Sequence, residues 1–299
     1  MNLKTLQSTS PWEWPDGAAD VLLNTLRDPA EKPSRQSVAI HLACESDVMN
    51  DAIADALLVI ARREDAPEEL RGAAAIALGP ALELASSDAF GDPEEEALTA
   101  QGFKNVQKTL QQMYVDATLP KLVRRRILEA AVRAPQEWHQ QAVRGAYASN
   151  DDDWRLTAVF CMEFIAGFDQ EILESLASSV PEIEHHAVRA AGNRELAEAW
   201  EHVEALLSNE DTDKALLLSA IEAAASIAPA QAGPILVEMA HSADEEIAEA
   251  AEVALILTES EEDQTFMDPD FFEDEEPEDE EPEDEEPEDE EPEDEEPLH

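Results

Sequence analysis

Apolar residues recur at helical spacing along most of the chain. The first helix is predicted to begin near Gly17 and to end at Asp28-Pro29, with one apolar face formed by Ala18, Val21, Leu22 and Leu26. A second helix opens at Pro33-Ser34, and a third is expected from Asp47 to Arg63. The pattern therefore predicts a series of amphipathic helices separated by short turns.

The stretch from Pro67 to Gly79 has the clearest helix signals. Pro is tolerated in the first turn of a helix, because its missing N–H has no partner there. Glu68 and Glu69 follow at the positive end of the helix dipole. A small-residue apolar face comes next, and Gly79 suits a C-terminal cap. We therefore expect this helix to end at Gly79.

Variants of this stretch recur down the chain. Aligned on the position of Arg71, the copies fall at Arg35, Arg71, Arg124, Arg155, Glu184, Leu217 and Ile247. Most intervals lie near 30 residues, which is typical of an α-solenoid built from helix pairs. One interval is longer, which indicates an insertion before Arg124. The predicted fold is all-α, with about seven helix pairs.

The repeats resemble HEAT repeats, in particular the short Ala-rich subclass shared with phycobilisome-lyase-type proteins. The motif Asp65-x-Pro67-x-x-Leu70-Arg71-x-Ala73-Ala74-x-x-Ala77-Leu78-Gly79 carries the resemblance, with a weaker copy at Val188-Arg189-Ala190-Ala191-Gly192. The likeness covers most of residues 17–257 and implies a right-handed superhelix. It also implies an Asp–Arg ladder, for which Asp65 and Arg71 have the spacing.

Three segments follow from this pattern. Residues 1–16 form an arm with Pro11-Trp12-Glu13-Trp14-Pro15, expected to cap the first helix pair; an exposed aromatic anchor is the alternative. Residues 17–260 form the solenoid, with an acidic insertion at 86–100 around Phe90. Residues 261–299 carry repeats of Glu-Glu-Pro-Glu-Asp, and we expect this acidic tail to be disordered.

The charge limits the partners. The 299-residue chain has 19 Lys and Arg against 71 Asp and Glu, a net charge of −52, and 26 of the acids lie from Glu259 onward. This disfavours direct binding to nucleic acid, whereas the tail could engage basic proteins. The two cysteines form no disulfide framework, and no stretch is long and apolar enough for a membrane span or secretion signal. We expect a cytoplasmic protein, for which a high-salt cytoplasm is one explanation of the acidity.

Catalytic motifs are missing from the sequence. HEAT-like hydroxylases bind di-iron through His-Glu dipeptides, and no His here is followed by Glu. There is also no nucleotide-binding loop, nucleophile elbow or zinc-ligand spacing. The sequence thus favours a non-enzymatic role without cofactor or metal. A bilin-lyase-type accessory or modifying enzyme stays open through the resemblance.

One basic concentration stands out in the acidic chain. The candidate partner-binding residues are Arg124, Arg125, Arg126, Arg133, Trp138, Trp154 and Arg155, together with Phe90 of the insertion. They could form a positive site for an acidic peptide or for the protein's own tail. Alternatively, the arginines pair with acids of neighbouring repeats.

The favoured function is a protein–protein interaction scaffold whose acidic tail keeps it soluble or engages basic partners. A bilin-lyase-type enzyme is the first alternative. An acidic chaperone, or nucleic-acid mimic, for basic proteins is the second. The sequence does not indicate an oligomeric state.

Overall fold

The computed structural model describes residues 2–44, 48–87 and 97–265, with side chains through residue 258. Every regular element in these ranges is a helix. The helices are α1 Leu3–Gln7, η1 Pro11–Glu13, α2 Ala18–Arg27, α3 Pro33–Cys44, α4 Asp51–Arg62, α5 Glu68–Ile76, α6 Gly79–Ser87, α7 Ala100–Val115, α8 Lys121–Ala131, α9 Glu137–Tyr147, α10 Asp152–Met162, α11 Asp169–Leu176, α12 Pro181–Asn193, η2 Ala197–Ala199, α13 Trp200–Ser208, α14 Lys214–Ile227, α15 Pro229–Met239 and α16 Glu245–Thr265. Phe90 and the tail from residue 266 onward lie outside the described residues.

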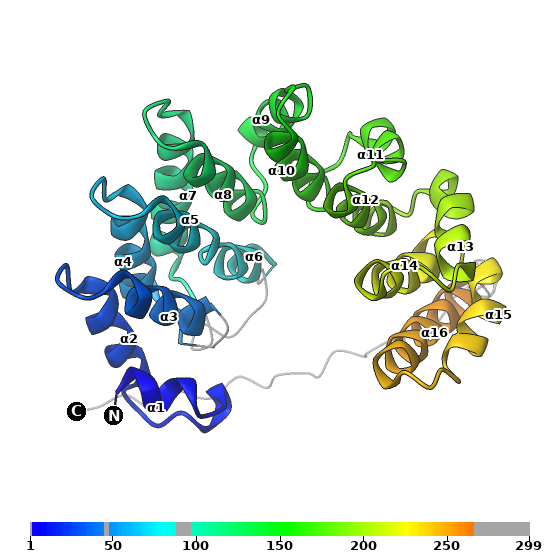
Figure 1. The fold of residues 1–299 in the computed structure, drawn as a ribbon, viewed down its shortest axis with the longest axis horizontal. Coiled ribbons are helices and arrows are strands. Elements are labelled where there is room, and N and C mark those ends of the chain that lie inside the picture. Colours follow the sequence, from blue (N-terminus) through cyan, green and yellow to red (C-terminus); the bar gives the residue numbers. More distant parts are fainter. Residues whose placement is uncertain (1, 45–47, 88–96, 266–299) are drawn as a thin grey trace, which may run out of the picture. The chain divides into compact units, whose positions relative to one another are not determined.

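Within the compact unit Met1–Glu259, the helices follow one another as pairs (Figure 1). The pairs are α2–α3, α4–α5, α7–α8, α9–α10, α11–α12, α13–α14 and α15–α16. Each of the seven aligned repeat positions falls in the first turn of the second helix of a pair. The predicted α-solenoid of about seven helix pairs is therefore confirmed.

Second helices form the continuous part of the stack. α5 packs on α8, α8 on α10, α10 on α12 and α12 on α14. Small residues permit close approach, because a Cβ added to Gly192 of α12 would lie 2.9 Å from Ala223 of α14. Among the first helices, α2 packs on α4 and α4 on α7, whereas no comparable packing joins α7 to α9 in this fully described part of the chain.

The core consists of two apolar clusters that meet at α8. The first runs from Leu3 to Ala134 and the second from Leu128 to Ala254. Two aromatic side chains, Tyr114 and Trp138, pack against both clusters. The α7–α10 region is thus the junction between the two halves of the core.

Two helix boundaries were wrong in the sequence prediction. The helix expected to begin at Asp47 begins at Asp51, with Asn50 as its N-cap. Gly79 does not cap α5, which ends at Ile76 with Ala77 as its C-cap. Gly79 instead begins α6, where a Cβ would lie 2.8 Å from the Cδ of Arg133. The glycine therefore leaves room for the side chain of Arg133, which follows α8, a constraint that the local sequence does not reveal.

The two Trp of the arm have different environments. The indole Nε1 of Trp14 donates hydrogen bonds to the carbonyls of Leu6 (3.1 Å) and Thr9 (3.0 Å). Leu3 and Leu6 of α1 are buried against the first helix pair. The side chain of Trp12 is 84% exposed. Trp14 thus holds the arm in place, and Trp12 points into solvent.

Candidate functional site: the α7–α10 junction

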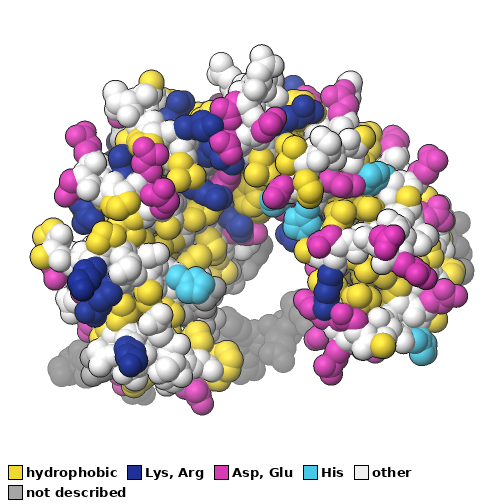
Figure 2. Space-filling model, in the orientation of Figure 1, with side chains coloured by type: hydrophobic (Ala, Val, Ile, Leu, Met, Phe, Trp, Pro, Cys, Tyr) yellow, Lys and Arg dark blue, Asp and Glu magenta, His cyan; other side chains and the backbone are white. Residues whose placement is uncertain are grey.

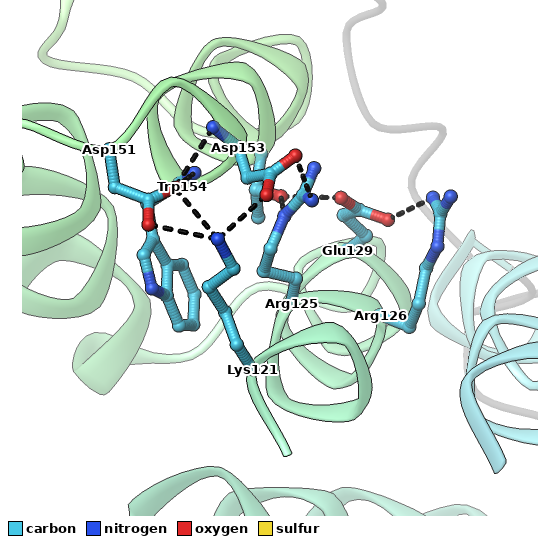
Figure 3. Close-up of polar contacts among 8 residues, drawn as sticks. Lys121, Arg125, Arg126, Glu129, Asp151, Asp153 and Trp154 are labelled. Atoms are coloured by element: carbon cyan, nitrogen blue, oxygen red, sulfur yellow. Dashed lines mark hydrogen bonds and ion pairs between the residues drawn. The ribbon is translucent and has the colours of Figure 1, made fainter. Parts of the chain in front are cut away.

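A connected polar network joins α8 to α10 (Figure 3). Its members are Lys121, Arg125, Arg126, Glu129, Asp151, Asp153 and Thr157. At its buried centre, Arg125 Nε donates to Thr157 Oγ1 (2.8 Å), and that hydroxyl donates to Glu129 Oε1 (2.6 Å). Arg125 is only 7% exposed, so its charge needs the ion pair with Asp153 (2.8 Å) to offset the loss of hydration.

The outer end of this network is a repeated feature of the solenoid. Lys121 Nζ contacts Asp151 (2.9 Å) and Asp153 (2.7 Å). At the end of the stack, Lys214 Nζ of α14 contacts Asp244 (2.8 Å) and Glu246 (2.6 Å) at the start of α16 in the same way. We call each arrangement a lysine clamp. Because the clamp recurs, we attribute it to the joining of repeats rather than to partner binding.

Most of the candidate arginines already have partners within the chain. Arg126 pairs with Glu129 (2.6 Å), and Arg133 pairs with Glu83 of α6. Arg155 donates to the hydroxyl of Tyr147 (3.3 Å) and lies over its ring. Arg133, Arg155 and Arg125 thus join different helices or their ends, whereas the Arg126–Glu129 pair lies within α8.

Arg71 does not complete the Asp–Arg ladder implied by the resemblance. Its Nε donates to the carbonyl of Ala61 (3.1 Å), while Asp65 contacts Arg63 (3.3 Å). Ala61 is the penultimate residue of α4, whose last carbonyls lack partners within the helix. The Arg at this position therefore caps the first helix of its own pair.

The same capping contact occurs in two other pairs. Gln36 Nε2 donates to the carbonyl of Leu26 (3.3 Å), and Arg124 Nε donates to the carbonyl of Tyr114 (2.9 Å). In each case the donor lies ten residues after the penultimate residue of the first helix. Capping thus explains the position of Arg124 but uses only one of its nitrogens.

Arg124 is also held by two aromatic rings. Its guanidinium carbon lies 5.4 Å from the ring centroid of Tyr114 and 5.6 Å from that of Trp154. The two rings meet edge to face at 6.4 Å. Cation–π contacts of this kind stabilise a guanidinium without neutralising its charge.

These residues line a pocket of about 270 Å³ between α7 and α9. Tyr114, Arg124 and Trp154 form its aromatic and charged side, and the rest is lined by Gln141, Ala142, Gly145, Ala146 and Ser149. A second hollow of about 500 Å³ adjoins it at Gln141 and is lined by Gln111, Gln136, Glu137 and Trp138. We call the two together the α7–α9 groove.

Trp138 links the two ends of the groove. Its ring lies 5.1 Å from Tyr114 and 3.9 Å from His139, and its Nε1 donates to the side chain of Gln136 (2.8 Å). His139 is 1% exposed, and its Nδ1 accepts a hydrogen bond from the backbone N–H of Gln136 (2.9 Å). Burial lowers the pKa of His139 to about 4. A neutral, fixed imidazole therefore supports the indole at the N-terminus of α9.

The structure thus brings Arg124, Trp138 and Trp154 together, three of the candidates selected from the sequence. Tyr114 and Gln141 were missed. Tyr114 is the residue that unites the cluster, since it contacts all three candidates. Its position as the penultimate residue of α7 is the only sequence signal that could have identified it.

Histidines form contacts that the sequence did not reveal. His186 lies 2.6 Å from the buried carboxylate of Glu163, which also accepts from Arg189 (3.1 Å). His185 and Ser219 share a hydrogen bond of 2.8 Å between α12 and α14. Among the side chains that the structure describes, no three His, Cys, Asp or Glu gather closely enough to hold a metal ion.

Basic side chains gather over α7 and α8 in the space-filling view (Figure 2). Residues 100–162 contain nine Lys and Arg against six Asp and Glu, in a chain of net charge −52. The groove therefore lies in a locally positive part of an acidic protein. In the described part of the chain, no helix combines the length and apolar character needed for a bilayer span.

Comparison with known proteins adds little. No family model matches the chain, and no curated protein does so either. Human deoxyhypusine hydroxylase in complex with glycerol is similar in structure, with 18% identity and a TM-score of 0.38 over 86% of this chain and 88% of that chain. An engineered protein has 20% identity and a TM-score of 0.40 over 70% of this chain and 96% of that chain. Neither likeness is close enough to support an inference about function.

Proposed function

We propose that this chain is a non-enzymatic protein–protein interaction scaffold and that partners bind in the α7–α9 groove. The observation that carries the proposal is the groove itself, where three aromatic rings and a guanidinium surround open hollows. Trp, Tyr and Arg are the residue types that most often dominate binding energy at protein interfaces.

The surrounding solenoid suits such a role. The groove residues lie on helices that are fixed by capping, by a lysine clamp and by stacking, so little conformational entropy is lost when a partner binds. The acidic tail supplies a second part of the proposal: it keeps the protein soluble or engages basic partners.

Affinity capture from a lysate tests this function with the full chain, Trp154→Ala and Trp12→Ala. Trp12 is the matched control, because it is an exposed Trp on the N-terminal arm. We expect captured partners to be lost with Trp154→Ala and kept with Trp12→Ala. Partners retained by Trp154→Ala would contradict binding in the groove, and partners lost only with Trp12→Ala would place the site on the arm.

The role of the tail is tested by the same capture with a chain that ends at Thr265. If the tail engages basic partners, the captured proteins that disappear should be basic. If it acts only on solubility, the captured set stays the same while the shortened chain aggregates at lower concentration.

A further inference from the structure

Arg124 differs from the two arginines that follow it. Arg125 and Arg126 each pair with a carboxylate, at 2.8 and 2.6 Å. Within the described residues, Arg124 forms no ion pair. Its charge is therefore available at the pocket of about 270 Å³ that it lines.

One oxygen of the nearby Asp116 carboxylate, Oδ1, is engaged by Thr118. It accepts hydrogen bonds from the hydroxyl (2.7 Å) and the backbone N–H (2.9 Å) of Thr118. These bonds lower the pKa of Asp116, and the charge of Arg124 makes a smaller contribution. Asp116 thus senses the guanidinium without pairing with it.

The guanidinium is fixed before any ligand arrives. The Nε bond to the Tyr114 carbonyl and the rings of Tyr114 and Trp154 set its position, while its two terminal nitrogens remain as donors. A planar pair of N–H donors matches the two oxygens of a carboxylate. Because the guanidinium of Arg124 is already ordered, little side-chain entropy opposes its contact with a carboxylate.

The rest of the pocket suits a peptide. Gln141 and Ser149 supply polar groups for a peptide backbone, and Trp154 supplies an apolar wall. A Cβ added to Gly145 would have no heavy atom within 4 Å, so the α9 side of the pocket is open. The local excess of Lys and Arg between residues 100 and 162 favours an acidic ligand.

We propose that the α7–α9 groove binds an acidic segment of a partner protein, with one Asp or Glu carboxylate on Arg124 and a neighbouring side chain against Trp154. This inference rests on the proposed function and specifies the chemistry of the partner. It predicts that the bound segment is acidic even though the protein as a whole is strongly negative.

The test begins with a phage-displayed library of random dodecapeptides selected on the full chain. Enrichment of Asp or Glu next to an apolar residue supports the proposal. The best peptide is then synthesised, and its affinity is measured by fluorescence anisotropy. We expect Arg124→Gln to weaken binding by roughly ten- to a hundredfold, the range for a charge-assisted hydrogen bond.

Two further variants separate binding from folding. Gln is the chosen replacement because Gln36 already caps the equivalent carbonyl in the first helix pair. Gly145→Met should obstruct the pocket and weaken binding without removing any native contact. Arg27→Gln on α2 makes the same charge change outside the groove and should leave the affinity within about twofold of the wild type.

A charge-neutral peptide completes the test. Replacing the acidic residue of the peptide by its amide should weaken binding to the wild type and have little additional effect on Arg124→Gln. Selected peptides without acidic residues, or Arg124→Gln binding within twofold of the wild type, would overturn the proposal. If such peptides were still blocked by Gly145→Met, the scaffold function would stand and only the acidic specificity would fail.

Discussion

His139 shows how one buried side chain links folding to pH. It is 1% exposed, and its Nε2 is buried without a hydrogen-bond partner, so protonation would place an unsolvated charge beneath Trp138. The neutral imidazole instead accepts from the backbone of Gln136. A residue that reads as an ordinary His in the sequence is therefore part of the support for the groove.

The folded protein should lose stability as the pH falls from 6.5 toward 4. The folded pKa of His139 is about 4, against 6.5 for an unperturbed His, so the unfolded chain binds the proton first. The contribution is fully present above pH 6.5 and declines by about 3 kcal/mol near pH 4. Urea unfolding of the wild type and His139→Gln across this range measures it. An equally steep decline in the variant would show that other groups are responsible.

Two glycines, one at a close helix contact and one facing open space, give a matched pair of substitutions that test helix packing. Gly192→Ala should destabilise the protein by about 1–3 kcal/mol, because the new Cβ would meet the backbone of Ala223 at 2.9 Å. Gly145→Ala should stabilise it by about 0.5–1 kcal/mol, because its Cβ meets nothing within 4 Å and Ala is the better helix former. Thermal unfolding measures both. Equal effects would mean that the close approach of α12 and α14 is not as described.

At the scale of the elements, each lysine clamp joins the second helix of one pair to the start of the second helix of the next pair. The clamps join α8 to α10 and α14 to α16. Asp151 also caps α10, since its Oδ1 accepts from the backbone N–H of Asp153 (3.1 Å). One carboxylate thus orders a helix terminus and fixes its neighbour. The clamp was not predicted because its partners lie 30 residues apart, beyond the range of helical periodicity.

The clamp of Lys214 should stabilise the fold only within a pH window. The pKa of Asp244 is lowered from 3.8 by its bond to Lys214, so its contribution is present above pH 3.8 and is lost as the pH falls through the folded value. The pKa of Lys214 is raised from 10.5 by its bonds to Asp244 and Glu246, so its contribution is fully present below pH 10.5 and is lost as the pH rises through the higher folded value.

The prediction is checked with Lys214→Met. Its Tm should lie below that of the wild type at pH 7, and the difference should disappear in strong acid, where the carboxylates are protonated. A difference that persists unchanged in strong acid would assign the effect to the packing of the Lys stem instead.

The sequence predicted the repeated helices well because their signals are local. Pro and acidic residues at helix starts, together with an apolar face, are sufficient to place the second helices. The roles of the arginines were less predictable. Whether Arg125 is buried and Arg124 accessible depends on Thr157, Asp153 and Tyr114, which come from other helices.

At the scale of the molecule, charge opposes compactness. The chain carries a net charge of −52, and repulsion between like charges destabilises a folded state. Raising NaCl from about 0.05 M to about 0.5 M should therefore raise the Tm, because screening shortens the range of repulsion. Differential scanning calorimetry measures the shift. A Tm that falls with salt would mean that ion pairs such as the clamps outweigh the repulsion.

The two apolar clusters meet at α8, so the groove lies where the halves of the core join. Tyr114 and Trp138 belong to this junction and also line or border the groove. A ligand that contacts them would therefore touch residues that both clusters hold in place. This placement makes the groove a rigid receptor rather than a loop that must order on binding.

Hydrogen exchange read by mass spectrometry tests the scaffold proposal most directly. The full chain is compared with and without the tightest peptide from the selection. We predict slower exchange in the C-terminal half of α7 and along α9, whose side chains line the groove. Slower exchange confined to other helices, or no change in α7 and α9 at saturating peptide, would contradict binding in the groove.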